Sequence, residues 1–336
     1  MKVDNTMILE NPLDAGAVAA ALEEIGYDTA YSFEGQHDPF LPLAIAAQTT
    51  NKITLGTGIA VAFARNPMNL ANLGYDLQLI TKGRFILGLG TQIQPHIEKR
   101  FGAVWSKPAA RMREMILAIR HIWQAWESDG KLNFEGEFYR HTLMTPTFNP
   151  GPNPHGLPKI FAAGVGPLMT EAMGEVADGF FIHPFNTEKS LRQLTLPALQ
   201  KGFDKAGKSR DDFEISCSVI VGTGNTEEQM AEAILKVRKQ IAFYGSTPAY
   251  RPILECHGWG ELHKELNRLS KLSQWDDMAN LIDDEVLNAI AIICPRELMA
   301  ERITQRLGGL VDRVNLVARY TGDESNWRDV VRDLKA

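Results

Sequence analysis

The sequence predicts an α/β barrel, in which eight parallel strands alternate with helices along the chain. Short apolar runs alternate with longer stretches of helical periodicity from end to end, an order typical of a parallel sheet covered by helices. Eight of these runs have the length and composition of strands, which is the number that closes such a barrel. At 336 residues the chain can hold one barrel with insertions.

The eight expected strands are rich in apolar, β-branched and small residues. They lie at 1–7, 29–33, 53–62, 84–90, 159–163, 179–183, 213–221 and 313–318. Between them, helical periodicity predicts helices at 14–25, 41–50, 109–126, 167–177, 188–206, 226–244 and 295–307, and a further one that begins at Pro67. We therefore expect a single domain over residues 1–336.

Two segments interrupt this alternation and are predicted to be insertions. The first, at about 130–158, is rich in proline and glycine, which favours an excursion from the barrel. The second, at about 248–285, is aromatic, polar and poorly periodic, and we expect a helical segment that covers the barrel mouth like a lid.

Composition excludes several classes of function. The net charge of −6 argues against a nucleic-acid partner that is held through its phosphates. The three cysteines are far apart in the sequence, so they predict neither a disulfide framework nor a thiolate metal site. No signal peptide or long apolar run is visible, so we expect a soluble, cytoplasmic protein that acts on a small molecule and does not bind a membrane.

Several motifs together resemble the luciferase-like monooxygenase family. They are GYDTAY, HDPFLPLAIAAQTTNKITLGTGIAV, RNPMNLA and KGRFILGLG in the first quarter, and AAGVGPLMTEAMGEVADGFF and GGLVDRVNL further along. RFGAVWSKPAARMRE, EGEFYRHTLMTP and STPAYRPILECHGWG are similar to the branch of F420-dependent oxidoreductases. The resemblance implies a TIM barrel with its cofactor at the carboxyl ends of the strands.

Glu34 and His37 are the predicted catalytic residues. They follow the second expected strand, at the barrel end where active sites form, and an imidazole titrates near neutral pH. The resemblance implies a cofactor-facing histidine or acid here. From spacing alone, the alternative is that this loop only caps the next helix. No other strand-end ligand accompanies the pair, so we expect no metal site.

Gly58, Ile59, Thr91 and His96 are predicted to bind the cofactor. The resemblance implies a cis peptide between Gly58 and Ile59 as a shelf under the cofactor ring, whereas spacing alone would suggest a glycine kink in a crowded strand. The Thr91 hydroxyl would lie at a strand end and could bond the cofactor. Some F420-dependent dehydrogenases carry a glutamate just beyond this threonine, where this chain has Gln92, Ile93 and Gln94. His96 is a candidate cofactor contact or a solvated loop residue.

A second cofactor contact is predicted at Gly164, Val165 and Gly166. They join an expected strand to a helix, and backbone amides at a helix start suit a phosphate. The family has a G-x-G-P loop at the matching place, which implies that it grips the cofactor phosphate; the alternative is a tight turn. His183, at the end of the next strand, is the candidate substrate contact.

These features predict an oxidoreductase that transfers hydride between coenzyme F420, an 8-hydroxy-5-deazaflavin, and a small organic substrate. One alternative is an FMN-dependent monooxygenase that is supplied by a flavin reductase. Another is a flavin-binding barrel without catalysis, which the fold alone does not exclude. Because relatives are commonly dimers, we also expect a homodimer.

Overall fold

The computed structural model describes residues 1–317 and 327–336, and eight parallel strands among these residues close into a barrel. The barrel strands follow one another around the ring in chain order, and β12 pairs with β1 to close it. They are β1 (Lys2–Thr6), β2 (Thr29–Ser32), β3 (Thr54–Thr57), β5 (Phe85–Gly90), β8 (Lys159–Ala163), β9 (Gly179–Ile182), β10 (Glu214–Gly222) and β12 (Arg313–Val317). The predicted TIM barrel is confirmed.

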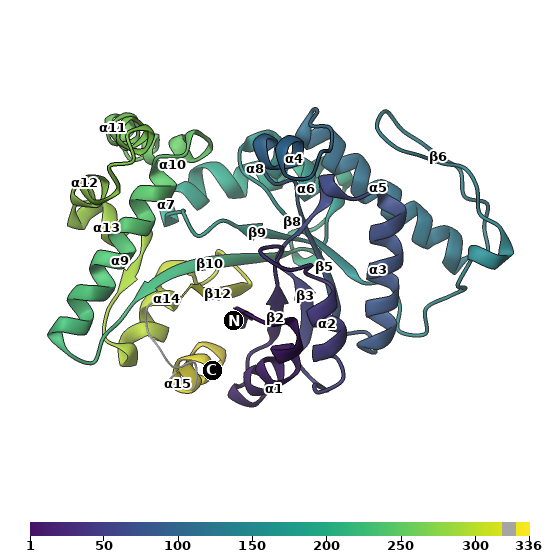
Figure 1. Cartoon of the computed structure of the whole chain (residues 1–336), viewed down its shortest axis with the longest axis horizontal. Coiled ribbons are helices and arrows are strands. Elements are labelled where there is room, and N and C mark those ends of the chain that lie inside the picture. The colour runs from purple at the N-terminus through teal and green to yellow at the C-terminus, as the bar shows by residue number, and fades with distance from the viewer. Residues whose placement is uncertain (318–326) are drawn as a thin grey trace.

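Helices surround the barrel and fill the connections between its strands (Figure 1). They are α1 (Ala15–Ile25), α2 (Leu41–Ala46), α3 (Pro67–Ile80), α4 (Gln94–Lys99), α5 (Pro108–Glu127), α6 (Pro167–Val176), α7 (Glu188–Ser190), α8 (Leu196–Ala206), α9 (Glu227–Gly245) and α14 (Met299–Leu307). A π-helical turn at Leu191–Thr195 joins α7 to α8. Thr226 caps α9 by accepting a hydrogen bond from the Gln229 N–H. The predicted helices therefore exist with shifted ends.

The final helix, α15 (Arg328–Lys335), was not predicted. Trp327, Val330, Val331 and Leu334 are buried, and they follow the i, i+3, i+4, i+7 spacing of an amphipathic helix. Lys335 donates hydrogen bonds to the Gly26 carbonyl and to Asp28, which fastens the helix beside the start of β2. Residue 318, the last of the predicted eighth strand, lies outside the described residues.

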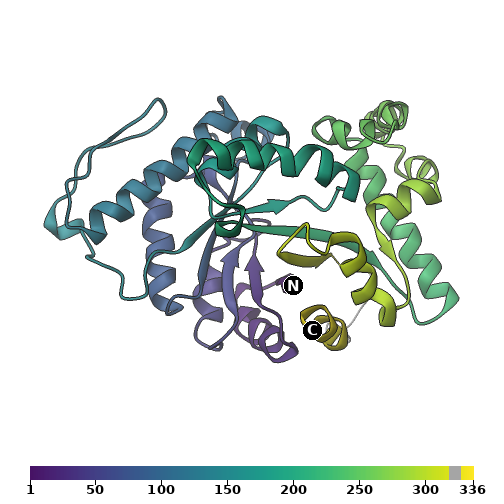
Figure 2. The same ribbon diagram turned by 180° about the vertical axis from the view of Figure 1, so that it is seen from behind.

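The two insertions lie at opposite ends of the molecule, as Figure 1 and the reverse view in Figure 2 show. The first contains the antiparallel hairpin of β6 (Phe134–Glu135) and β7 (Arg140–His141). The Glu114 carboxylate of α5 accepts hydrogen bonds from three consecutive backbone N–H groups of this hairpin, those of residues 137–139. The hairpin is thus anchored to the barrel helix.

The second insertion is helical, as predicted, but most of it does not cover the barrel mouth. It comprises a 3-10 turn at Pro248–Tyr250, α10 (Arg251–Glu255), α11 (Gly260–Lys271), α12 (Trp275–Asn280) and α13 (Asp284–Ile290). These helices pack on α9 and form a hydrophobic core of their own with Phe185. Two short strands complete the sheet, because β4 (Ala60–Val61) pairs with β5 and β11 (Ile292–Ile293) extends β10.

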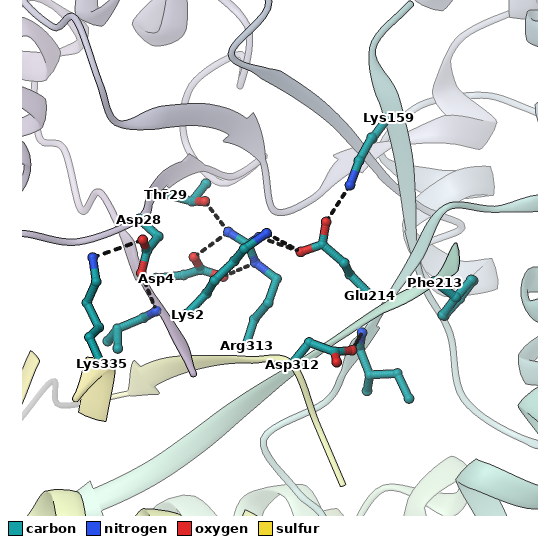
Figure 3. Close-up of polar contacts among 12 residues, drawn as sticks. Lys2, Asp4, Asp28, Thr29, Lys159, Phe213, Glu214, Asp312, Arg313 and Lys335 are labelled. Carbon is teal, nitrogen blue, oxygen red and sulfur yellow. Dashed lines mark hydrogen bonds and ion pairs between the residues drawn. The ribbon is translucent and has the colours of Figure 1, made fainter. Parts of the chain in front are cut away.

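A buried ion network closes the amino-terminal end of the barrel (Figure 3). Arg313 is 3% exposed, and its guanidinium donates to both Asp4 oxygens at 2.8 and 2.9 Å, to Glu214 at 2.7 Å and to the Thr29 hydroxyl. Burial disfavours the ionised form of Glu214, but hydrogen bonds from Lys159, Lys2 and Arg313 outweigh it and lower the Glu214 pKa to about 2. We call this cluster the floor network.

Candidate active site

A cavity of about 1440 Å³ opens at the carboxyl ends of the barrel strands, opposite the floor network. Residues at or just beyond the ends of β3, β5, β8 and β9 line it together with residues of α5 and α6, and most of its surface is apolar. The predicted residues that line it are Gly58, Ile59, Thr91, Gly164, Val165, Gly166 and His183. Seven candidates from four separate loops therefore meet in one space, which is the usual site of catalysis in this fold.

The peptide bond between Gly58 and Ile59 is cis, as predicted. The Gly58 N–H donates to the Ser32 carbonyl at 2.7 Å, and the Glu34 N–H donates to the Ile59 carbonyl at 3.0 Å. A Cβ atom on Gly58 would lie only 3.0 Å from Cβ and Cγ of Tyr31, so the close approach of the Tyr31 side chain favours glycine here. Whether this wall supports a cofactor ring stays a prediction.

Thr91 lines the cavity beside Gly90, and its hydroxyl donates to the Gln92 carbonyl at 3.0 Å. The hydroxyl oxygen can still accept a hydrogen bond from a ligand. His96 lies on α4, is exposed and is not among the lining residues, whereas its loop neighbours Gln92 and Gln94 are. The structure thus places the two amides, rather than the imidazole, at the wall.

Gly164, Val165 and Gly166 form the loop between β8 and α6. Gly166 has φ +85°, a conformation that favours glycine, and a Cβ added there would meet no atom within 4 Å. No side chain caps α6, so its first backbone N–H groups face the cavity end without a side-chain acceptor. Packing favours glycine at position 164, because a Cβ there would lie 2.2 Å from Cγ of Met169.

Charged side chains gather near this loop and pair with one another. Arg113 of α5 donates to both carboxylate oxygens of Glu175, which lowers the pKa of that carboxyl, and Lys205 of α8 pairs with Glu171. All four residues line the cavity.

His183 lies just beyond β9 and lines the cavity. Its ring stacks on Tyr250 with centroids 4.4 Å apart and meets the edge of Tyr244 at 4.7 Å. Nδ1 accepts a hydrogen bond from the Phe185 N–H at 3.1 Å. Burial lowers the His183 pKa to about 4, so the imidazole is neutral at pH 7.

Glu34 and His37 lie outside the cavity lining. The Glu34 side chain is 7% exposed, forms a 2.5 Å ion pair with Arg65 and accepts the Val61 N–H at 2.6 Å. His37 Nε2 donates to the Glu10 carbonyl at 3.0 Å. Both residues hold neighbouring loops together in this structure. The proton-transfer role that the sequence suggested for them stays a prediction.

Several lining residues come from other barrel strands or from the second insertion. Tyr31, Phe181, Ser218 and Asn315 project from barrel strands or their ends and were not predicted. Ser218 and Asn315 could have been found, because each is a polar residue between two apolar neighbours in its strand. Thr247 and Tyr250 come from the start of the second insertion. The sequence placed Tyr250 on a segment that could fold over the mouth, whereas Thr247 required the tertiary structure.

In residues 1–317 and 327–336, no group of three or more His, Cys, Asp and Glu side chains could hold a metal ion. Within the same residues, each helix is too short or too polar to cross a membrane.

Comparisons with known proteins agree with this architecture. An uncharacterised protein of Mycobacterium tuberculosis is 54% identical over 315 residues, which cover 94% of this chain and 92% of that protein. The 5,10-methylenetetrahydromethanopterin reductase of Archaeoglobus fulgidus is 28% identical over 298 residues, 84% of this chain and 82% of the reductase. The coenzyme F420-dependent tetrahydromethanopterin reductase of Methanopyrus kandleri has a similar fold, with a TM-score of 0.79 at 20% identity over 98% and 96% of the two chains.

The family of luciferase-like monooxygenases matches residues 4–313, which include the barrel strands from β2 to β10 in full, most of β1 and the first residue of β12. This chain therefore belongs to the luciferase-like monooxygenase family and is an oxidoreductase.

Proposed function

We propose that this chain transfers hydride between coenzyme F420 and a small organic substrate. One observation carries the proposal: a single cavity joins an apolar wall at Gly58, Ile59 and Gly90 to the uncapped start of α6 at Gly166. The wall suits a flat ring, and the α6 start suits a phosphate. The deazaflavin has both groups, and when bound it supplies the redox step.

The chain's own residues would bind and orient the cofactor. The loop 164–166 would hold the phosphate by backbone N–H groups, and the open space at Gly166 lets an anion approach the backbone closely. Thr91 would bond the ring or its side chain, and His183 would contact the substrate. The M. kandleri protein is by name F420-dependent, which supports F420 over FMN.

FMN is the alternative cofactor because it also carries a ring and a phosphate. It would make the chain a monooxygenase that uses oxygen and a flavin reductase as partner. In either case we propose a small-molecule substrate, a homodimer and a cytoplasmic location, with no nucleic-acid or membrane partner.

The test is a fluorescence titration of the purified chain with F420 and, separately, with FMN. We expect micromolar binding of F420 and at least tenfold weaker binding of FMN. Alcohols and enones would then be screened anaerobically for hydride transfer. A preference for FMN would favour the monooxygenase, tight binding without turnover would favour a non-catalytic barrel, and binding of neither would refute the assignment.

Gly166→Ala sharpens this titration. The methyl group would strain the backbone at φ +85° and crowd the proposed phosphate site, so we expect F420 affinity to fall about tenfold. Gly207→Ala is the matched control, because Gly207 also has positive φ and open space around its Cβ position but ends α8. It should leave F420 affinity within about twofold of the original value. Equal effects of the two substitutions would argue against a phosphate at the α6 start.

A further inference from the structure

The position of the proton on His183 is fixed by its neighbours. Nδ1 accepts the Phe185 N–H, so in the neutral ring the proton must lie on Nε2. Asn186 donates to the His183 carbonyl at 2.7 Å and holds the turn in place. The stacked Tyr250 ring and the edge of Tyr244 fix the ring plane. His183 is therefore a rigid hydrogen-bond donor.

This donor has no protein acceptor. In the described part of the chain no hydrogen bond is formed by Nε2, although the residue lines the cavity. A donor of this kind at the wall of a cavity with a mostly apolar lining favours a ligand that brings an acceptor atom. The imidazole remains neutral because burial lowers its pKa to about 4.

Within the part of the chain that the structure describes, the groups that face His183 are also uncharged. They are the phenols of Tyr244 in α9 and Tyr250 in the 3-10 turn, and the Cys217 thiol of β10 behind Asn186. Burial raises the pKa of Tyr250 and raises that of Cys217 to about 12, so both are protonated near neutral pH. Arg306 of α14 lies beyond Cys217 and does not line the cavity.

Charged lining residues belong to other elements and have partners. Arg113 and Lys205 come from α5 and α8 and pair with Glu175 and Glu171 of α6. Lys107 pairs with Glu137 of the hairpin. The cavity thus has a charged end at α6 and an uncharged, aromatic end at His183. Burying an anion at the aromatic end would be unfavourable, since among residues 1–317 and 327–336 no cation compensates it there.

From this arrangement we infer that the substrate is an uncharged, largely apolar carbonyl compound, or the alcohol derived from it. Its oxygen accepts a hydrogen bond from Nε2–H of His183, and its hydrocarbon part lies beside Tyr250. The inference rests on the proposed hydride transfer, and it names the substrate class of the same site. Phosphorylated and carboxylate substrates are excluded from the aromatic end by the same argument.

Ligand binding tests the inference without turnover. Fluorine NMR titrations of the full chain would use 4-fluoroacetophenone, its counterpart 4-fluoroethylbenzene, which lacks the oxygen, and the anion 4-fluorobenzoate. We expect the ketone to bind about tenfold more tightly than the hydrocarbon, as one hydrogen bond to a buried donor would provide. Benzoate should bind most weakly, and the ketone preference should persist from pH 8 to pH 5.5.

Three variants assign the preference to His183. His183→Phe keeps an aromatic ring on Tyr250 but removes the donor, so the preference should fall below about twofold while hydrocarbon affinity is retained. His183→Gln can place an amide N–H near the position of Nε2 and should restore most of the preference. His155→Gln, an exposed site in the segment before β8, is the control and should change nothing.

The inference is overturned if wild type does not bind the ketone at millimolar concentration, if benzoate binds more tightly, or if His183→Phe keeps the preference. The urea unfolding midpoint of each variant is also measured to show that it is folded, and wild type is titrated with F420. If wild type does not bind F420 but still prefers the ketone, the proposed function is refuted and the inference about the substrate is not. Failure of the proposed function and failure of this inference are therefore distinguishable.

Discussion

The two ends of the barrel handle buried polar groups in opposite ways. At the floor, every guanidinium nitrogen of Arg313 donates to a protein oxygen, and Glu214 accepts from three cations. At the mouth, His183 has one ring nitrogen bonded to the backbone and the other free to face the cavity. Groups that satisfy one another stabilise the fold, whereas a buried donor without a partner is available to a ligand.

Glu34 and His37 show that location at the mouth is not sufficient for a functional role. Both follow β2 at the end where active sites form, yet their bonds go to Arg65, Val61 and Glu10. In bonding they resemble the floor network more than they resemble His183. This comparison leads us to expect that they act mainly on stability.

The largest expected effect is on the floor network. Arg313→Met would leave Asp4 buried beside an apolar side chain, so we expect a loss of about 3 to 5 kcal/mol in the free energy of unfolding. Urea denaturation measures it. Lys2→Met removes a half-exposed partner of Glu214 and should cost less than about 1 kcal/mol. If Arg313→Met lowers the free energy of unfolding by less than 1 kcal/mol, the floor network does not stabilise the fold in the way described here.

The second effect is a pH dependence at the mouth. His183 has a folded pKa of about 4, below its ordinary value of 6.5, so the unfolded chain takes up a proton first as the pH falls. The stabilising contribution is complete above pH 6.5 and is lost progressively down to about pH 4. At pH 5 we expect wild type to have lost about 2 kcal/mol more than His183→Phe has, relative to pH 7.5. Parallel curves for the two proteins would show that His183 is accessible to protons when folded.

Sequence patterns predicted the strands and helices of this molecule better than the hydrogen-bond partners of its side chains. Strand β5 was recognisable from the buried run RFILGLG, and the cis bond at Gly58 and Ile59 was expected from the motif resemblance. The partners of Glu34 and His37 lie about 30 residues away in the sequence, and no periodicity predicts such pairs. Helix α15 was not predicted, although the apolar spacing of Trp327, Val330, Val331 and Leu334 is visible in the sequence.

The same limit applies to the second insertion. Its helical character was predicted, but composition did not show that the helices after Tyr250 would form their own core on α9. Only Thr247, Ala249 and Tyr250 reach the cavity. The segment that was expected to be a lid therefore lines only a short part of the cavity. That part includes Tyr250, whose ring stacks on His183.

The smallest expected effect decides the role of the β2 loop. His37→Ala removes one exposed hydrogen bond to the Glu10 carbonyl, so we expect turnover to fall less than about tenfold, whereas general acid or base catalysis contributes about 100-fold or more. The measurement is the steady-state oxidation of reduced F420 with 4-fluoroacetophenone, compared with His183→Phe. A 100-fold loss with unchanged F420 affinity would assign proton transfer to His37, and it would mean that the loop rearranges when the cofactor binds, since the imidazole lies outside the cavity lining. A small loss would mean that His37 does not transfer the proton. The hydrogen bond from His183 to the substrate carbonyl would then be the main polar contact of the substrate, and the proton would come from water.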